Sequence, residues 1–148
     1  MNEQEELEAR PHEVQFWLTW ALDQDGTLVG DLRVRNISQR TVRVSGKPSL
    51  RPLGVDGQPL DTRFIVTLEG RLPNYVQLAS GAEAVAPVGS GGWTGPPASG
   101  CVVVGWPGGR VEVSASGPRQ PTSPGPATNL WSSWFTEQPA RGISGRLR

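Results

Sequence analysis

The stretch that decides the fold runs from Leu28 to Leu53 and reads LVGDLRVRNISQRTVRVSGKPSLRPL. In its first part, leucine and valine alternate with aspartate and arginine. An apolar residue at every second position predicts a half-buried β-strand. The same alternation returns at Val42 and Val44 after a short polar segment, so the sequence predicts a β-hairpin. We expect the solvent face of this hairpin to carry Arg33, Arg35 and Arg43.

Further strands must cover the apolar face, because an isolated hairpin is only marginally stable in water. The clearest of them is Val14–Leu22, in which Phe16 and Leu18 share one face while Trp17 lies on the other. Trp17 either packs under a loop or contacts a partner. Other short apolar or alternating runs follow, separated by glycine and proline turns. They lie at residues 49–53, 64–66, 74–78, 82–88, 101–106 and 110–115.

The pattern is that of an all-β protein, with about eight short strands and a turn signal every 8 to 12 residues or so. It favours an antiparallel, immunoglobulin-like β-sandwich, with a small barrel as the alternative. Because Pro52 interrupts the run at residues 49–53, that piece is expected to be an edge strand or a crossover. We divide the chain into an acidic lead-in (1–11), a sandwich domain (12–116) and a C-terminal segment (117–148).

The C-terminal segment begins as an extended linker rich in proline and serine, at residues 118–129. Aromatic residues then recur four positions apart, which predicts one face of a short helical turn. A helix this short needs a groove to bind, either on its own domain or on another protein. Aromatic anchors followed by arginines are typical of a docking motif. The candidate partner-binding residues are Leu130, Trp131, Trp134, Phe135, Arg141, Arg146 and Arg148, together with Trp17.

Charge and composition narrow the function classes. The 14 basic and 14 acidic residues balance, so we expect no long-range attraction to nucleic acid or to an anionic membrane. No apolar run approaches the roughly 18 residues of a membrane span. The acidic start does not resemble a secretory signal, and a single cysteine allows no internal disulfide. These features predict a cytoplasmic protein.

The residues needed for catalysis are scarce. His12 is the only histidine and lies in the lead-in, where we expect it to be solvated. Cys101 lies among valines and is expected to behave as a small buried hydrophobic residue. Two such residues are too few for a structural metal site. We therefore predict a non-enzyme with no metal, cofactor or small-molecule substrate.

Several short motifs resemble an uncharacterised actinobacterial family, the domain of unknown function 4232 family. They are Asn36-Ile37-Ser38, Ser45-Gly46-Lys47-Pro48, Asp56-Gly57, the run from Val76 to Ala84, and Cys101. The resemblance implies a single immunoglobulin-like sandwich in proteins that are mostly exported or lipid-anchored, and it implies no activity. The family commonly has a cysteine about where Val42 stands, so the resemblance also implies that Cys101 survives from a lost disulfide.

Two function classes remain after these exclusions. The first is a protein-binding module that attaches to a larger partner through the aromatic C-terminal segment. The second is a structural accessory subunit of a multi-subunit particle, such as a virion-like particle or an enzyme complex, or else an envelope-associated protein of unknown role. Both imply a protein partner.

Overall fold

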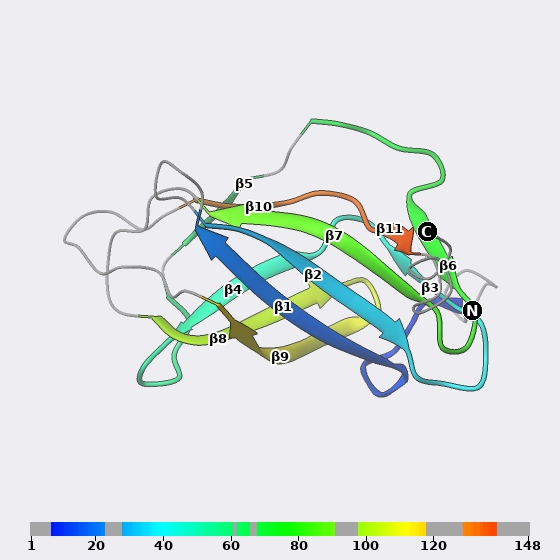
Figure 1. Cartoon of the computed structure of the whole chain (residues 1–148), viewed down its shortest axis with the longest axis horizontal. Coiled ribbons are helices and arrows are strands. Elements are labelled where there is room, and N and C mark those ends of the chain that lie inside the picture. The colour runs from blue at the N-terminus through cyan, green and yellow to red at the C-terminus, as the bar shows by residue number, and fades with distance from the viewer. Residues whose placement is uncertain are drawn as a thin grey trace, which may run out of the picture.

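The structure is a computed structural model that describes residues 7–22, 28–60, 62–65, 68–90, 98–117 and 129–138. Within these residues the chain forms one short 3-10 helix and a series of β-strands (Figure 1). The all-β prediction is confirmed. In chain order the elements are η1 (Pro11–Glu13), β1 (Val14–Leu22), β2 (Leu28–Asn36), β3 (Val42–Ser45), β4 (Ser49–Gly54), β5 (Arg63–Ile65), β6 (Tyr75–Leu78), β7 (Glu83–Ser90), β8 (Ala98–Trp106), β9 (Gly109–Ser116), β10 (Asn129–Ser132) and β11 (Thr136–Gln138).

One layer, which we call the front layer, has β1, β2 and β7 at its centre. β1 and β2 pair antiparallel along their whole length, and β7 pairs antiparallel with β2 on its other side. In Figure 1 these strands run side by side across the molecule, with β10 next to β7. The alternation predicted from the sequence is confirmed here, since Leu32 and Val34 are fully buried while Asp31 and Arg35 are exposed.

The other layer, the back layer, consists of β4, β8 and β9. β8 pairs antiparallel with both neighbours, and β4 lies at the edge of the main sheet, which is one of the two alternatives that Pro52 predicted. The two layers join where β9 pairs with β1 in parallel over two residue pairs, Leu18 with Ala115 and Thr19 with Ser116. The pairing is therefore not purely antiparallel. The sheet folds over on itself and encloses one core.

That core is built from the inward positions of both layers. Phe16 of the front layer meets Trp106 of the back layer, with ring centroids 5.0 Å apart. The indole Nε1 of Trp106 donates a hydrogen bond of 2.9 Å to the carbonyl of Ala9, which ties the start of the described chain to the hairpin of β8 and β9. The two rings are tilted by 48°, and aromatic contacts at this separation add to the energy of burial.

The predicted hairpin between β2 and β3 is wrong. β3 pairs with β6 in a separate two-stranded sheet, whereas β2 pairs with β1 and β7. As a result, Arg43 does not share the solvent face of Arg33 and Arg35; its guanidinium lies 4.0 Å from the centre of the Tyr75 ring. Sequence periodicity marks strands but does not specify which strands pair.

Asn36 explains why the chain leaves the front layer after β2. Its side chain is fully buried, and Nδ2 donates to the carbonyls of Arg40 (2.7 Å) and Leu78 (2.9 Å). Its Oδ1 accepts from the backbone N–H (2.9 Å) and the hydroxyl (2.7 Å) of Ser38. The Asn36-Ile37-Ser38 motif is thus a hydrogen-bonded corner that directs the chain toward β3.

The Ser45-Gly46-Lys47-Pro48 motif forms a second corner, between β3 and β4. Gly46 has a φ of +76°, a left-handed conformation that glycine adopts without steric cost. Ser45 donates from its backbone N–H (3.0 Å) and its hydroxyl to the buried carboxylate of Glu8. The acidic lead-in therefore contributes a structural residue that its charge alone did not reveal.

The described part of the C-terminal segment belongs to the sheet. β10 pairs with β7 on one side and with β5 on the other, and β11 pairs with β7 farther along. The predicted helical turn at residues 130–135 is therefore wrong. Leu130 and Ser132 face inward and are buried, while Trp131 between them faces outward, so the segment has the period of a strand.

Candidate functional site

Leu130 and Phe135, two of the predicted partner-binding residues, lie in the core of the domain. Leu130 is 0% exposed and Phe135 is 1% exposed. The ring of Phe135 lies 6.4 Å from that of Phe16, between the centroids. Both side chains are covered by this domain, so neither is exposed to a second protein.

Trp131 lies on the outer face of the front layer and covers Gly89. A Cβ built on Gly89 would meet the indole ring of Trp131 at 2.4 Å, so the ring lies directly against the glycine backbone. Val29 and Ile65 occupy the positions on either side of this pair, and each remains more than a third exposed. Together they form an apolar row across the outer face of the sheet.

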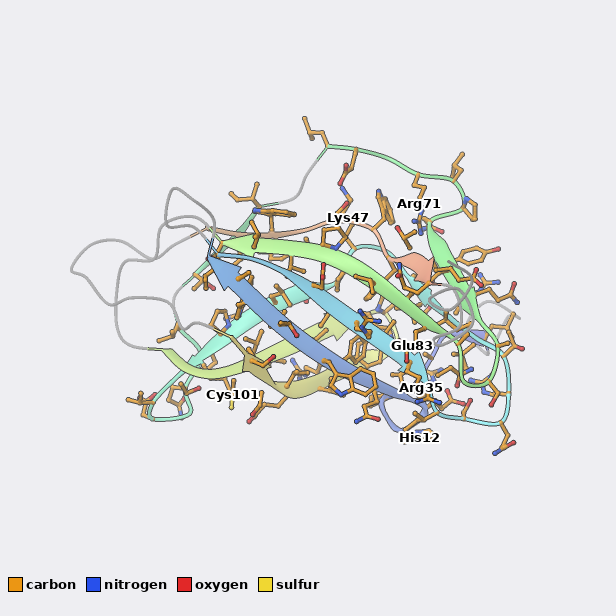
Figure 2. All side chains as sticks on the ribbon, in the orientation of Figure 1. His12, Arg35, Lys47, Arg71, Glu83 and Cys101 are labelled. Carbon is orange, nitrogen blue, oxygen red and sulfur yellow. The ribbon has the colours of Figure 1, made fainter. Side chains whose placement is uncertain are left out.

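Trp134 is held between two cations. The Lys47 ammonium and the Arg71 guanidinium each lie 5.2 Å from the centre of its ring. The indole Nε1 also donates a hydrogen bond of 3.2 Å to the carbonyl of Glu69. Figure 2 shows Lys47 and Arg71 on the same upper side of the molecule. Cation–π contacts of this kind each stabilise by roughly 0.5–1 kcal/mol at exposed sites.

These contacts brace the loop of residues 68–72. Arg71 also donates to the carbonyls of Phe135 and, at 3.3 Å, of Pro73. The Glu69 carboxylate accepts a hydrogen bond of 2.7 Å from the hydroxyl of Ser133. The loop is thus fastened from two sides to the segment between β10 and β11, and Figure 1 shows it arching over these strands.

The braced loop presents two leucines to solvent. Leu68 is 99% exposed and Leu72 is 94% exposed. Single exposed apolar side chains are common on protein surfaces. Here two leucine side chains within five residues are almost completely exposed, on a loop that is held by hydrogen bonds. Together they form a distinct apolar patch. Neither leucine is among the residues predicted from the sequence to contact a partner, although the alternation of leucine with charged residues around Gly70 was a visible signal.

Trp17 lies on the outer face of the front layer, and it is 38% exposed. It is directly opposite Arg33, whose guanidinium forms an ion pair of 3.1 Å with Glu83. Arg35 lies one pair farther along the same face and is exposed (Figure 2). The remaining predicted partner-binding residues, Arg141, Arg146 and Arg148, lie outside the described residues.

Glu13 is a buried carboxylate that the sequence analysis did not single out. Two nitrogens of the Arg40 guanidinium donate to its two oxygens, and the backbone N–H of Arg10 donates to Oε1 at 2.9 Å. The hydrogen bonds from Arg40 are the largest cause that lowers the pKa of Glu13, from 4.5 to about 2, against the opposing effect of burial. This ion pair joins η1 to the turn after β2.

The two residues considered for nucleophilic chemistry lie apart. Figure 2 shows His12 and Cys101 in separate places, on η1 and on β8. Cys101 is half-buried rather than buried as predicted, with its sulfur 3.7 Å from the Ser114 hydroxyl. In the described part of the chain, no three histidine, cysteine, aspartate or glutamate side chains lie close enough together to hold a metal ion. Nor does that part contain a helix that is long and apolar enough to span a membrane.

Fold and surface define a two-layer all-β domain with a braced, leucine-bearing loop. The chain belongs to the family described as "Domain of unknown function (DUF4232)", which matches residues 13–139. This match reaches past β11, so the C-terminal strands fall within the family's domain. No curated protein and no solved structure matches the chain.

Proposed function

We propose that this chain is a non-catalytic protein-binding module whose contact element is the loop of residues 68–72. The observation that carries the proposal is the nearly complete exposure of Leu68 and Leu72. Burying a leucine side chain stabilises a complex by about 1.5–3 kcal/mol. Two leucines therefore supply enough free energy to anchor a partner.

The bracing of the loop supports a role in binding. A loop that is already held in one conformation loses little conformational entropy when it binds. The contacts of Trp134 with Lys47, Arg71 and Glu69 provide this support from within the domain. Trp134 thus retains the role in binding expected from the sequence, but it acts by positioning the loop.

The partner that fits this loop is a protein with two adjacent apolar pockets. The leucines are separated by Glu69, Gly70 and Arg71, so the contact has an apolar pair with charged groups between its members. A rim with one basic and one acidic group on the partner would complement these charges.

Site-specific photo-crosslinking in the source cells tests the proposal. A benzophenone amino acid at position 68 is expected to give a discrete crosslinked product with one other protein. The matched control places the same group at Ile37, which is 53% exposed in the turn after β2 and lies outside the loop. Equal products from both positions, no product from position 68, or a product containing only a second copy of this chain would contradict the proposal.

Once the partner is identified, the change Leu68→Ser with Leu72→Ser measures the contribution of the leucines. We expect affinity to fall about a hundredfold, since roughly 3 kcal/mol of burial is lost. The melting temperature should stay unchanged, because neither side chain packs in the domain. The variant Val55→Ser, which changes another well-exposed apolar residue, should bind as the wild type does.

A further inference from the structure

The outer face of the front layer carries a feature that the proposed function does not use. Trp131 covers Gly89 on β7, as described above. Asp31 lies on the neighbouring strand β2, two residues along from the position opposite Gly89. Trp17 lies on β1, two residues farther in the same direction from the position opposite Asp31. The three side chains form a line, which we call the diagonal, across strands that lie side by side (Figure 1).

The length of the diagonal follows from the geometry of the sheet. Each step moves by one strand and by two residues along it. Such a step between neighbouring strands spans about 7–8 Å, so two steps span roughly 15 Å. A tryptophan therefore lies at each end of the diagonal and a carboxylate lies at its middle.

Trp131 presents a flat aromatic surface at one end. A Cβ built on Gly89 would lie 2.4 Å from both Cε2 and Cζ2 of the indole. Cε2 is an inner atom of the ring system, so this short distance means that the face of the ring, rather than its edge, lies on the sheet. Because Trp131 is only half-buried, the opposite face is the one that is open to solvent. Trp17, at the other end, is 38% exposed.

Hydrogen-bonding groups lie between the two rings. Asp31 is exposed, and within the part of the chain that the structure describes its carboxylate has no hydrogen bond or ion pair. Thr19, directly opposite Asp31, adds an exposed hydroxyl. The indole N–H of Trp131 has no acceptor among the described residues. The diagonal thus offers an acceptor, a donor and a group that does both.

The charges on this face cancel. Four charged side chains project outward from β1, β2 and β7, namely Asp31, Arg33, Arg35 and Glu83. Arg33 and Glu83 form an ion pair of 3.1 Å, and Arg35 and Asp31 are exposed and of opposite sign. Two cations and two carboxylates give no net charge, so the face suits a ligand that is itself uncharged.

We propose that the diagonal binds a neutral oligosaccharide. A pyranose ring has an apolar face of C–H groups, which carry a small positive charge and pack on the negative face of an aromatic ring. Its hydroxyl groups both donate and accept hydrogen bonds, so they complement the carboxylate, the indole N–H and the threonine hydroxyl. A purely apolar ligand would instead remove the Asp31 carboxylate from water without supplying a donor. Because the two rings lie at opposite ends of the diagonal, the ligand is a chain of sugar units.

The first experiment titrates the full chain, labelled with ¹⁵N, with cellotetraose, maltotetraose, chitotetraose and mannotetraose in turn. We expect one of these sugars to give saturable shifts of the indole N–H signals of Trp17 and Trp131. The indole signal of Trp134 is the internal control and should not move, because its N–H is bonded to the Glu69 carbonyl. No shift with any of the four sugars, shifts that do not saturate, or an equal shift of the Trp134 signal would overturn the proposal.

The corresponding monosaccharide tests whether both ends of the diagonal take part. It should bind weaker than its tetrasaccharide by about tenfold or more, because one ring cannot contact both tryptophans. Equal affinities would restrict binding to a single ring and would refute the diagonal.

Variants test the named side chains. Trp17→Ala and Asp31→Asn should each weaken binding of the tetrasaccharide by about tenfold or more. Asp31→Asn keeps the shape of an exposed side chain, so it remains informative if Trp17→Ala lowers the melting temperature. Trp131 is left in place because its removal would uncover Gly89. The control Glu112→Gln changes an exposed carboxylate on β9 and should bind within about twofold of the wild type; equal weakening by this control would contradict the site.

Photo-crosslinking separates a sugar from a protein ligand on this face. A benzophenone amino acid is placed at Val29, which is 38% exposed beside the diagonal, and the full chain is irradiated in the source cells. We expect no discrete product with another protein from this position. A protein product that Trp17→Ala abolishes would show that a protein covers the face, and the oligosaccharide proposal would then be wrong.

Discussion

Replacing Asn36 with Asp tests the hydrogen-bonded corner that ends β2. The substitution keeps the size and shape of the side chain, and it keeps the oxygen that accepts from Ser38. It replaces the Nδ2 amide, which donates to the carbonyls of Arg40 and Leu78, with a second oxygen. Two carbonyl oxygens would then face a carboxylate with no donor between them.

The expected loss of stability follows from these contacts. Two hydrogen bonds are removed, at about 1 kcal/mol each. A buried carboxylate with no cation beside it, and with donors from Ser38 on only one of its oxygens, adds at least as much again, because Asn36 is 0% exposed. We therefore expect the free energy of unfolding to fall by about 4 kcal/mol at pH 7, a large share of the stability of a domain of this size.

The introduced carboxyl also gives the variant a distinctive pH dependence. Burial and the two facing carbonyls raise the pKa of this carboxyl above its unfolded value. The penalty is therefore fully present above the folded pKa and declines as pH falls toward the unfolded pKa, near 4. At low pH the protonated group donates to one of the two carbonyls, so the variant should approach the wild type.

Urea unfolding followed by tryptophan fluorescence measures both effects, at pH 7 and at pH 4, against the wild type at the same pH. Asn74→Asp is the matched control, since it makes the same change at an exposed side chain and should cost less than about 0.5 kcal/mol. A loss at position 36 below 1 kcal/mol at pH 7, or a loss that grows as pH falls, would refute this account of the corner.

Three further changes test the core, an ion pair and the cysteine. Phe135→Ala should lower the stability by about 3–5 kcal/mol in a melting experiment, because the ring is 1% exposed. The control Thr136→Ala should leave the stability unchanged. An unchanged melting temperature for Phe135→Ala would place this segment outside the core. Glu13→Gln should lower stability at pH 7 by about 1–2 kcal/mol, since the partner Arg40 is 42% exposed and screened by solvent. Because the pKa of Glu13 is lowered from 4.5 to about 2, its contribution is present above pH 4.5 and is lost as pH falls toward 2, so acid titration of both proteins should show the difference shrinking. Cys101→Ala should lower the free energy of unfolding by less than about 1 kcal/mol, and reductants should not change the melting temperature. A larger loss of stability, or a melting temperature that falls with reductant, would reveal a role for the thiol.

Local alternation in the sequence was sufficient to identify most strands and their inward faces. Phe16 and Leu18 in β1, and Leu32 and Val34 in β2, were expected to face the core, and these four residues are buried. The side chains at every second position of an extended backbone point to the same face, so this property depends only on neighbouring residues. The edge position of β4 is one of the two alternatives that follow in the same way, because Pro52 lacks a backbone donor.

Periodicity predicted the wrong structure at residues 130–135, because the period of a helix and the period of a strand both fit this short segment. Leu130 and Trp134 are four residues apart, which matches a helix, but Leu130 and Ser132 are two residues apart, which matches a strand. Pairing with β5 and β7 decided between them, and these strands lie more than 35 residues earlier in the chain. Leu130 and Phe135, two of the candidate partner-binding residues, are buried in the core as a result.

The sequence by itself determined that this protein is all-β and which faces of its main strands are apolar. Only the tertiary structure decided that β3 pairs with β6, that Phe135 fills the core, and that Leu68 and Leu72 stay uncovered. The alternation of side chains along a strand is a local property of the backbone. The exposure of a side chain depends instead on contacts with residues that are distant in the chain, and a local sequence pattern does not specify these contacts.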